Sequence, residues 1–307
     1  MRIFQITQKD LKTSLLLLFF TLVLIAQQQP QSTQYLQNPA LYNAAYIGTL
    51  EGLNLTGSYR SQWTGIDNAP SMISFVGEQQ LNPKIGLGFS VLNDDFGPTA
   101  NTDLSAHFSY KIRLRSNLDL RFSLSAIGSF FTLNTSELNI ANPTEGVLGN
   151  SDNSFTPNLG IGTLISADKW FFGLSSPALF NTEDDEIAEG FRTQAALVNI
   201  MGGYHFELSR NWGIKPTFLV QQYNNSPTVF NLTANVLFQE RISVGANYRN
   251  DETLGAILGF WITNNIGVYY SYDYAMGALG AVSNGSHEFL LCFQLNRNGR
   301  SVSIGRN

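Results

Sequence analysis

Two stretches between residues 230 and 249 place an apolar side chain at every second position, with polar or small residues between them. The apolar positions are Phe230, Leu232, Ala234, Val236, Phe238, Ile242, Val244, Ala246 and Tyr248. A period of two is typical of a β-strand, which then has one apolar and one polar face. Because only a short break at Gln239 and Glu240 separates the stretches, they predict a β-hairpin. The fold then depends on whether the apolar face is turned toward a protein core or toward lipid.

The same alternation recurs along the chain, and we expect fourteen strands in one domain. The expected strands are residues 52–60, 71–80, 84–93, 101–113, 118–132, 156–166, 169–176, 193–208, 211–222, 228–238, 241–249, 252–263, 265–275 and 286–296. After residue 26, no segment keeps a convincing helical period and no polar or Pro-rich linker divides the chain. Pro216 falls inside an expected strand, where it cannot donate a ladder hydrogen bond, so we expect a β-bulge there.

Charged residues are sorted to one face of these strands. In the strands near residues 101–113, 118–128, 198–208 and 265–275, every charge lies on the face opposite the large apolar residues. A Lys or Arg that faces the middle of a bilayer costs about 2–4 kcal/mol, so contact with lipid would require this sorting. Only 13% of residues are charged, against roughly 25% in soluble domains. The mean hydropathy of -0.05 excludes a helical membrane protein.

The connections favour a membrane barrel over a secreted soluble barrel or sandwich, which is the alternative. Short joins alternate with longer ones, and the longer ones are 61–70, 94–100, 133–155, 177–192, 223–227 and 276–285, with 250–251 as a short exception. This alternation and an even strand number are typical of outer-membrane barrels. The sequence therefore predicts an all-β, 14-stranded antiparallel transmembrane β-barrel in the outer membrane. It would have short periplasmic turns, longer outer loops and an N-terminal periplasmic or plug segment.

The N-terminus is expected to be a signal peptide over residues 1–26. Arg2, Lys9 and Lys12 precede an apolar run that ends at Ala26 and is too short for a comfortable membrane span. An uncleaved anchor is the alternative. Residues 27–50 do not alternate and form a leader that would lie at the periplasmic mouth or fold into the lumen as a plug. The barrel would then cover residues 51–296, followed by a C-terminal tail at 297–307.

The sequence offers little catalytic chemistry, and we expect no enzyme, cofactor or metal site. The three histidines, His107, His205 and His287, fall in separate expected strands, with His107 and His205 facing the lumen. The acidic run Glu183–Glu186 lacks ordered ligand spacing, so a solvated loop is favoured over a Ca²⁺ site. The single cysteine, Cys292, is expected to be an inward-facing filler. A net charge of -5 without a basic stripe argues against a nucleic-acid partner.

Three blocks near the N-terminus carry a family resemblance. They are "QQQPQSTQYLQNPALYNAAYIG", "YRSQWTGIDNAPSMISF" and "KIGLGFSVLNDDFGPT". The sequence resembles the PorP/SprF outer-membrane proteins of the type IX secretion system. The matching positions that we expect to be structural are Asn38, Pro39, Gly48, Gly65, Gly86, Gly88, Asn93, Asp94, Gly97 and Pro98. Ala44 and Ile47 depart from the family pattern, which has Pro and Ala at these positions.

The resemblance implies an accessory of type IX protein secretion. Such a protein would bind the C-terminal sorting domain of a secreted cell-surface protein, often an adhesin used in gliding motility, and would work with other secretion components. The residues that we expect to bind the partner are Tyr35, Tyr42, Tyr46, Arg60, Gln62 and Trp63. A Trp at a strand end is also typical of the membrane interface, which is the simpler interpretation of Trp63. The alternative function is a plugged outer-membrane channel for small or hydrophobic solutes, and an outer-membrane enzyme is a more distant third.

Overall fold

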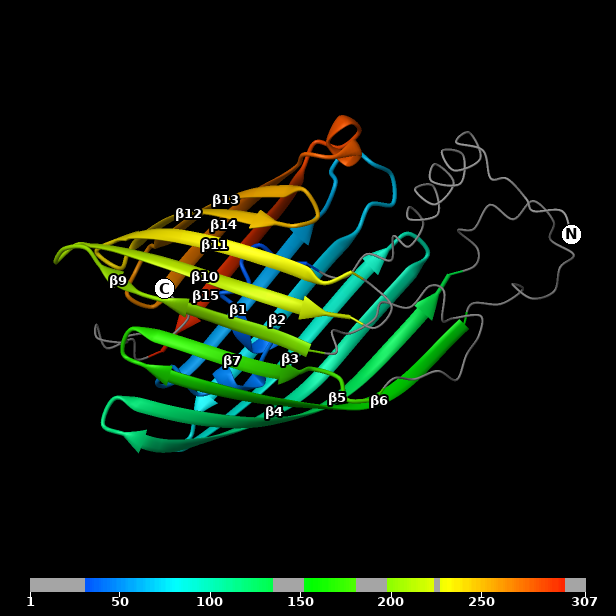
Figure 1. Ribbon diagram of the computed structural model, residues 1–307. Helices are drawn as coiled ribbons and strands as arrows, with labels where there is room; N and C mark the ends of the chain where they lie inside the picture. The colour runs from blue at the N-terminus through cyan, green and yellow to red at the C-terminus, as the bar shows by residue number, and fades with distance from the viewer. Residues whose placement is uncertain (1–30, 135–151, 181–197, 224–226, 296–307) are drawn as a thin grey trace, which may run out of the picture.

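The computed structural model describes residues 31–134, 152–180, 198–223 and 227–295, and these form one closed antiparallel β-barrel (Figure 1). The strands are β1 (Leu53–Ser61), β2 (Ser71–Gln80), β3 (Ile85–Phe96), β4 (Thr99–Arg115), β5 (Leu118–Leu133), β6 (Asp152–Ala167), β7 (Trp170–Ser176), β8 (Val198–Tyr204), β9 (Phe206–Glu207), β10 (Trp212–Gln222), β11 (Val229–Phe238), β12 (Ile242–Arg249), β13 (Thr253–Trp261), β14 (Ile266–Ala275) and β15 (Ser286–Gln294). Strands β8 and β9 are two pieces of one strand, so the barrel has fourteen strands and the predicted fold is confirmed. Within the described ranges, no helix is both long and apolar enough to cross a membrane.

The barrel closes where the first and last strands meet. Strand β1 pairs with β15, and Arg60 lies opposite Glu288 in that ladder. Strand β10 pairs with β11, which joins the two halves of the sheet into a ring. Closure leaves no open sheet edge around the ring, which a spanning β-structure requires because lipid cannot hydrogen-bond to the backbone.

The apolar face of the strands points outward. In β11, Asn231 is fully buried and Asn235 is 2% exposed, whereas Leu232 is 44% exposed. The same alternation runs through β13, where Leu254 and Leu258 are exposed and lie between buried positions. Since the lumenal side carries the polar residues and the outer side carries the large apolar ones, lipid is the medium that this surface fits.

The two ends of the barrel differ in their connections. At the end where β1 begins, the turns are short, at 81–84, 116–117, 168–169, 208–211, 239–241 and 262–265. At the other end, the connections include 62–70, 223–228 and 276–285. By the usual rule for outer-membrane barrels, the short turns are periplasmic and the longer connections are external. We call these the periplasmic end and the external end.

One expected outer loop is a turn. Residues 94–100 were expected to form a loop, but β3 extends to Phe96 and β4 begins at Thr99. Gly97 and Pro98 alone connect them, with Gly97 at φ 54°, in the left-handed region that glycine tolerates. The polar residues at 93–95 end the apolar alternation, but they do not end the backbone pairing, because Asp95 pairs with Ala100.

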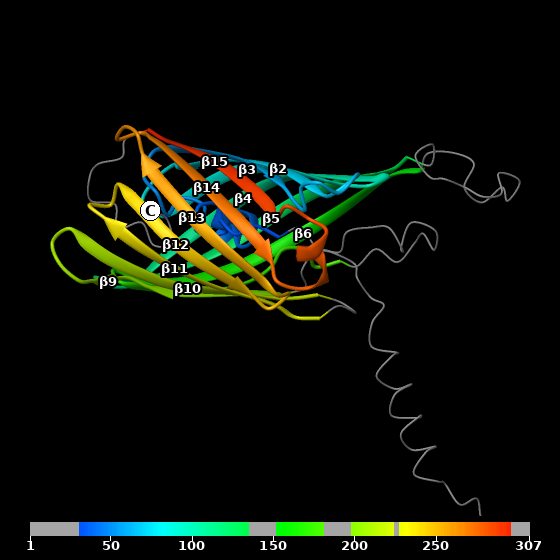
Figure 2. The same cartoon turned by 90° about the horizontal axis from the view of Figure 1, so that it is seen from above.

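The barrel wall extends further toward the external end on the side formed by β4, β5 and β6. Strands β4, β5 and β6 contain 17, 16 and 16 residues, whereas β7 contains 7. Their external ends project beyond the neighbouring strands (Figure 2). The expected loop at 133–155 is correspondingly shorter, because β5 reaches Leu133 and β6 begins at Asp152. Residues 1–30, 135–151, 181–197 and 296–307 lie outside the described residues, and with them the signal peptide, the tail and the acidic run Glu183–Glu186.

Pro216 interrupts a strand without creating a bulge. Thr217 pairs with Gly203 and Ile214 pairs with Phe206, so the two pairs are three residues apart on both strands. No residue is inserted, and the predicted bulge is wrong. Between these pairs the ladder is broken opposite Pro216, because proline has no N–H to donate. This break divides the expected strand 193–208 into β8 and β9.

Candidate functional site: the plug in the lumen

The leader folds into the lumen. Residues 31–50, which we call the plug, are buried except for Leu41 and Thr49, which are partly buried. They form two short 3-10 turns, η1 (Pro39–Leu41) and η2 (Ala44–Tyr46). In both ribbon views this blue segment lies inside the ring of strands (Figures 1 and 2). Of the two expected positions for the leader, the structure has the lumenal one.

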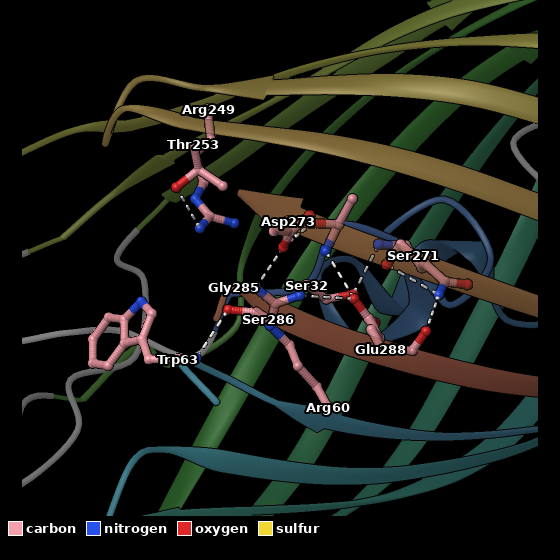
Figure 3. Close-up of polar contacts among 12 residues, drawn as sticks. Ser32, Arg60, Trp63, Arg249, Thr253, Ser271, Asp273, Gly285, Ser286 and Glu288 are labelled. Atoms are coloured by element: carbon pink, nitrogen blue, oxygen red, sulfur yellow. Dashed lines mark hydrogen bonds and ion pairs between the residues drawn. The ribbon is translucent and has the colours of Figure 1, made fainter. Parts of the chain in front are cut away.

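A buried ion cluster lies near the external end of the lumen. The Arg60 Nη2 atom is 2.7 Å from Asp273 Oδ2, and its Nη1 atom is 3.3 Å from Glu288 Oε2 (Figure 3). All three side chains are at most 2% exposed. Three neighbouring strands, β14, β15 and β1, supply these residues, which we call the Arg60 cluster. Buried charges of this kind persist only when they are paired and hydrogen-bonded.

The plug completes the hydrogen bonding of the Arg60 cluster. Ser32 Oγ donates to Glu288 Oε1 at 2.5 Å, and the Thr33 backbone N–H donates to Glu288 Oε2 at 3.0 Å. Thr33 Oγ1 lies 2.7 Å from Asp273 Oδ2. Hydrogen bonds to charged acceptors are stronger than those between neutral groups. The two carboxylates therefore bind the plug as well as Arg60.

The other end of the plug is bound near the periplasmic end of the lumen. The Gly48 N–H donates to Glu78 Oε2 at 3.0 Å, and Arg121 Nη2 donates to the Gly48 carbonyl at 2.7 Å. Ser109 Oγ donates to the Ile47 carbonyl at 2.5 Å. Strands β2, β4 and β5 supply these partners. Both backbone groups of Gly48 are therefore satisfied by the barrel wall.

Glycines in β3 allow the plug backbone to approach this closely. A Cβ atom on Gly86 would lie 2.6 Å from the Ile47 carbonyl oxygen, and one on Gly88 would lie 2.7 Å from Ile47 Cδ1. Both distances are too short for a side-chain carbon. Gly48 itself has φ 72°, in the left-handed region. The "GLG" block of β3 and the plug residues Ile47 and Gly48 therefore lie in direct contact.

The middle of the plug is largely apolar. Its members pack against lumenal side chains of β6, β7, β8 and β10 in one cluster, which consists of Tyr35, Leu36, Tyr42, Ala45, Tyr46, Leu164, Phe171, Met201 and Leu219. The Tyr35 hydroxyl is 3.1 Å from Thr217 Oγ1.

Polar groups of the wall bind the plug backbone around Tyr42 and Asn43. Ser175 Oγ and Asn199 Nδ2 both donate to the Tyr42 carbonyl, at 2.6 and 2.9 Å. Asn43 Nδ2 donates to the Thr163 carbonyl at 2.9 Å. Hydrogen bonds therefore join the plug to strands β2, β4–β8, β10, β14 and β15.

Five of the six residues expected to bind a partner are buried inside the barrel. Tyr35, Tyr42 and Tyr46 belong to the apolar cluster, and Arg60 belongs to the Arg60 cluster. Gln62 is buried at the end of β1. The sixth, Trp63, is half-buried in the external connection 62–70, and its backbone N–H donates to Ser286 Oγ at 3.2 Å (Figure 3). Their contacts in this structure are internal, and partner binding by them stays a prediction.

The residues expected to be structural lie in the plug, at its contacts with β3, in turns and at the external end of β3. Pro39 is the first residue of η1, a favoured place for proline. Asn38 Nδ2 donates to Ser74 Oγ, and Asn93 Nδ2 donates to Thr102 Oγ1, at 3.3 and 3.0 Å. Gly65 has φ 94° beside Asn284, Asp94 is buried, and Pro98 follows Gly97 in the β3–β4 turn.

Sequence reasoning missed the partners of Arg60. Asp273 and Glu288 are more than two hundred residues away in the chain. The signal available in the sequence was that both side chains fall on the inward face of strands whose residues alternate between polar and apolar. Only closure of the ring brings Glu288 opposite Arg60 and Asp273 next to it, and this depends on the register between β1, β14 and β15.

A family model described as type IX secretion system membrane protein PorP/SprF matches residues 24–293. The chain belongs to the PorP/SprF family. The membrane-barrel fold and the family together place this PorP/SprF protein in the outer membrane. No curated protein matches it significantly. Among the described residues, no group of three His, Cys, Asp or Glu could hold a metal ion.

Solved structures similar to the PorP/SprF chain are outer-membrane barrels. The outer membrane protein Omp33 of Acinetobacter baumannii has a TM-score of 0.50 at 10% identity, with 81% of this chain and 100% of that chain covered. The monoaromatic hydrocarbon channel CymD has a TM-score of 0.49 at 10% identity, with 85% and 91% covered. The toluene transporter TbuX of Ralstonia pickettii has 0.48 at 11% identity, with 83% and 92% covered. At such identities the likeness concerns the fold alone.

Proposed function

We propose that this PorP/SprF protein binds the C-terminal domain of a secreted cell-surface protein, for export or attachment at the outer membrane. Its family makes it a membrane component of type IX secretion. The cargo domain, the adhesin nature of the cargo and a role in gliding motility are the proposed parts. Catalysis is not part of the proposed function.

The filled lumen is the observation that carries this proposal. The plug contacts strands around the ring, from Glu288 on β15 to Thr163 on β6, and its apolar middle packs against the wall. A barrel filled in this way is poorly suited to be an open solute pore. Its external connections and the projecting ends of β4–β6 are the surfaces left for a large partner.

Cross-linking from the external end tests the proposal. Asn68 and Val282 are exposed in the connections 62–70 and 276–285, so each can carry a single Cys or a photo-cross-linker in place of the native side chain. We expect cross-linking in cells to attach a secreted protein with a type IX C-terminal domain. A probe at Lys84, in a periplasmic turn, is the matched control. Recovery of lipid alone, or of no partner from either external position, would count against cargo binding.

A channel for small or hydrophobic solutes is the second candidate. One observation favours this function. The plug is covalently linked to the described strands at its C-terminal end, where it continues into β1. Deletion of the gene separates the two functions. Loss of one displayed surface protein with unchanged solute uptake supports the secretion accessory, whereas lost uptake with intact display supports the channel.

A further inference from the structure

The plug runs through the lumen in a defined direction. Gln31 Nε2 donates to the Tyr223 hydroxyl at 3.3 Å, and Tyr223 directly follows β10 at the external end. Gly48 is bound by Glu78 and Arg121, which lie close to the periplasmic turns at 81–84 and 116–117. The chain then enters β1 at the same periplasmic end. The first described residue of the plug is therefore external and its last is periplasmic.

We infer that the leader enters the barrel from the external mouth, and that the Arg60 cluster holds its free end there. A partner outside the cell can reach this end of the plug, whereas a periplasmic partner meets only the tethered end. The inference concerns the barrel and its plug alone, and it does not depend on the identity of a cargo.

This direction bears on the expected signal peptide. Four residues separate Ala26 from Gln31, and the five Cα–Cα steps between them span about 18 Å at most. The apolar band of an outer-membrane barrel is about 25 Å tall. An apolar segment at residues 1–26 that stayed in the inner membrane could not connect to Gln31 at the external mouth. The inferred direction is therefore incompatible with residues 1–26 remaining as an inner-membrane anchor.

The Arg60 cluster is the strongest polar attachment near the free end. Ser32 and Thr33 provide three donors to two carboxylates, and such charge-assisted bonds are stronger than neutral ones. The neighbouring bonds from Gln31 to Tyr223 and from Gln34 to Ser271 join neutral groups. At the C-terminal end of the plug, the covalent link to β1 remains even if the hydrogen bonds of Gly48 break. Release from outside would thus begin at the Arg60 cluster.

Labelling of single cysteines in cells tests the direction. In a Cys292→Ser background, Gln28→Cys is treated with a membrane-impermeant maleimide in intact and in permeabilised cells. Asn68→Cys reports the external side and Lys84→Cys reports the periplasmic side. We expect position 28 to be labelled in intact cells, like position 68. If position 28 is not labelled in intact cells in which position 68 is labelled, the inferred direction is wrong.

A second labelling experiment tests the role of the Arg60 cluster. Gln37→Cys replaces a plug residue that is 4% exposed. Ser32→Ala with Thr33→Val removes hydroxyl donors without changing the ion pairs of the wall, so the barrel itself should still fold. We expect the label to react with position 37 about tenfold faster or more in that variant. Thr49→Val, at the tethered end, is the matched control and should leave the rate unchanged. An unchanged rate in the Ser32 and Thr33 variant, or an equal increase with Thr49→Val, would overturn the inference.

Discussion

Single residues in β3 make room for the plug. The sequence alone identified Gly86 and Gly88 as motif positions, but it did not show why glycine is needed there. A strand glycine has many uses, and the use here is space for Ile47, which belongs to a segment without any alternation. The same holds for Arg60, whose carboxylate partners are defined only by ring closure.

Gly86→Ala should destabilise the protein. The new Cβ would meet the Ile47 carbonyl at 2.6 Å, and the plug or β3 would have to shift. Overpacking of this kind costs about 1–3 kcal/mol. Gly57→Ala is the control, because its Cβ would lie 3.8 Å from the nearest neighbour, at ordinary contact distance. The two variants can be compared by denaturant unfolding in detergent or lipid vesicles. Equal stability would contradict the close approach of the plug to β3.

Arg60→Gln should be strongly destabilising. It leaves Asp273 and Glu288 buried without their cation, and breaking a buried pair costs about 3–5 kcal/mol. Arg113→Gln breaks the pair with Asp119, where the Arg113 side chain is 64% exposed, and should change stability by less than about 1 kcal/mol. Unfolding curves of both variants give the comparison. A cost for Arg60→Gln as small as that for Arg113→Gln would mean that the Arg60 cluster is not desolvated.

At the scale of the strands, the period of two was sufficient for most of the fold. Every expected strand is present, and the direction of the apolar face in β11 is confirmed. The errors lie at positions where the backbone pairing does not follow the side-chain pattern. Polar residues 93–95 continue a ladder that the apolar pattern had ended, and Pro216 removes a ladder bond without changing the register.

Leu258→Arg tests the lipid-facing side of β13. Leu258 is 54% exposed near the middle of its strand. A lipid-facing Arg near the bilayer midplane should cost about 2–4 kcal/mol on refolding into vesicles, and one near the interface about 0–1 kcal/mol. Gln79→Arg, at the exposed periplasmic end of β2, provides the interface control. Equal refolding free energies for the two variants would show that water, rather than lipid, surrounds this face.

At the scale of the whole molecule, the plug occupies the lumen of the barrel. Its apolar middle and its polar ends fit the lumen at many points, and several of the lumenal polar residues that the strand pattern predicts bind this segment. The sequence left the place of the leader open, because a non-alternating segment carries no signal for what covers it. Burial of Tyr35 and Tyr46 inside the ring gives the answer.

Single-channel recording in planar bilayers tests the closed lumen most directly. We expect the purified wild-type protein to give little steady conductance, because the plug fills the lumen. A variant that lacks residues 31–46 and retains Gly48 and the start of β1 should give stable open-pore currents. Both proteins should first be shown to refold as barrels by their resistance to unfolding in detergent. Steady open-pore currents from the wild-type protein, equal to those of the deletion variant, would contradict the account.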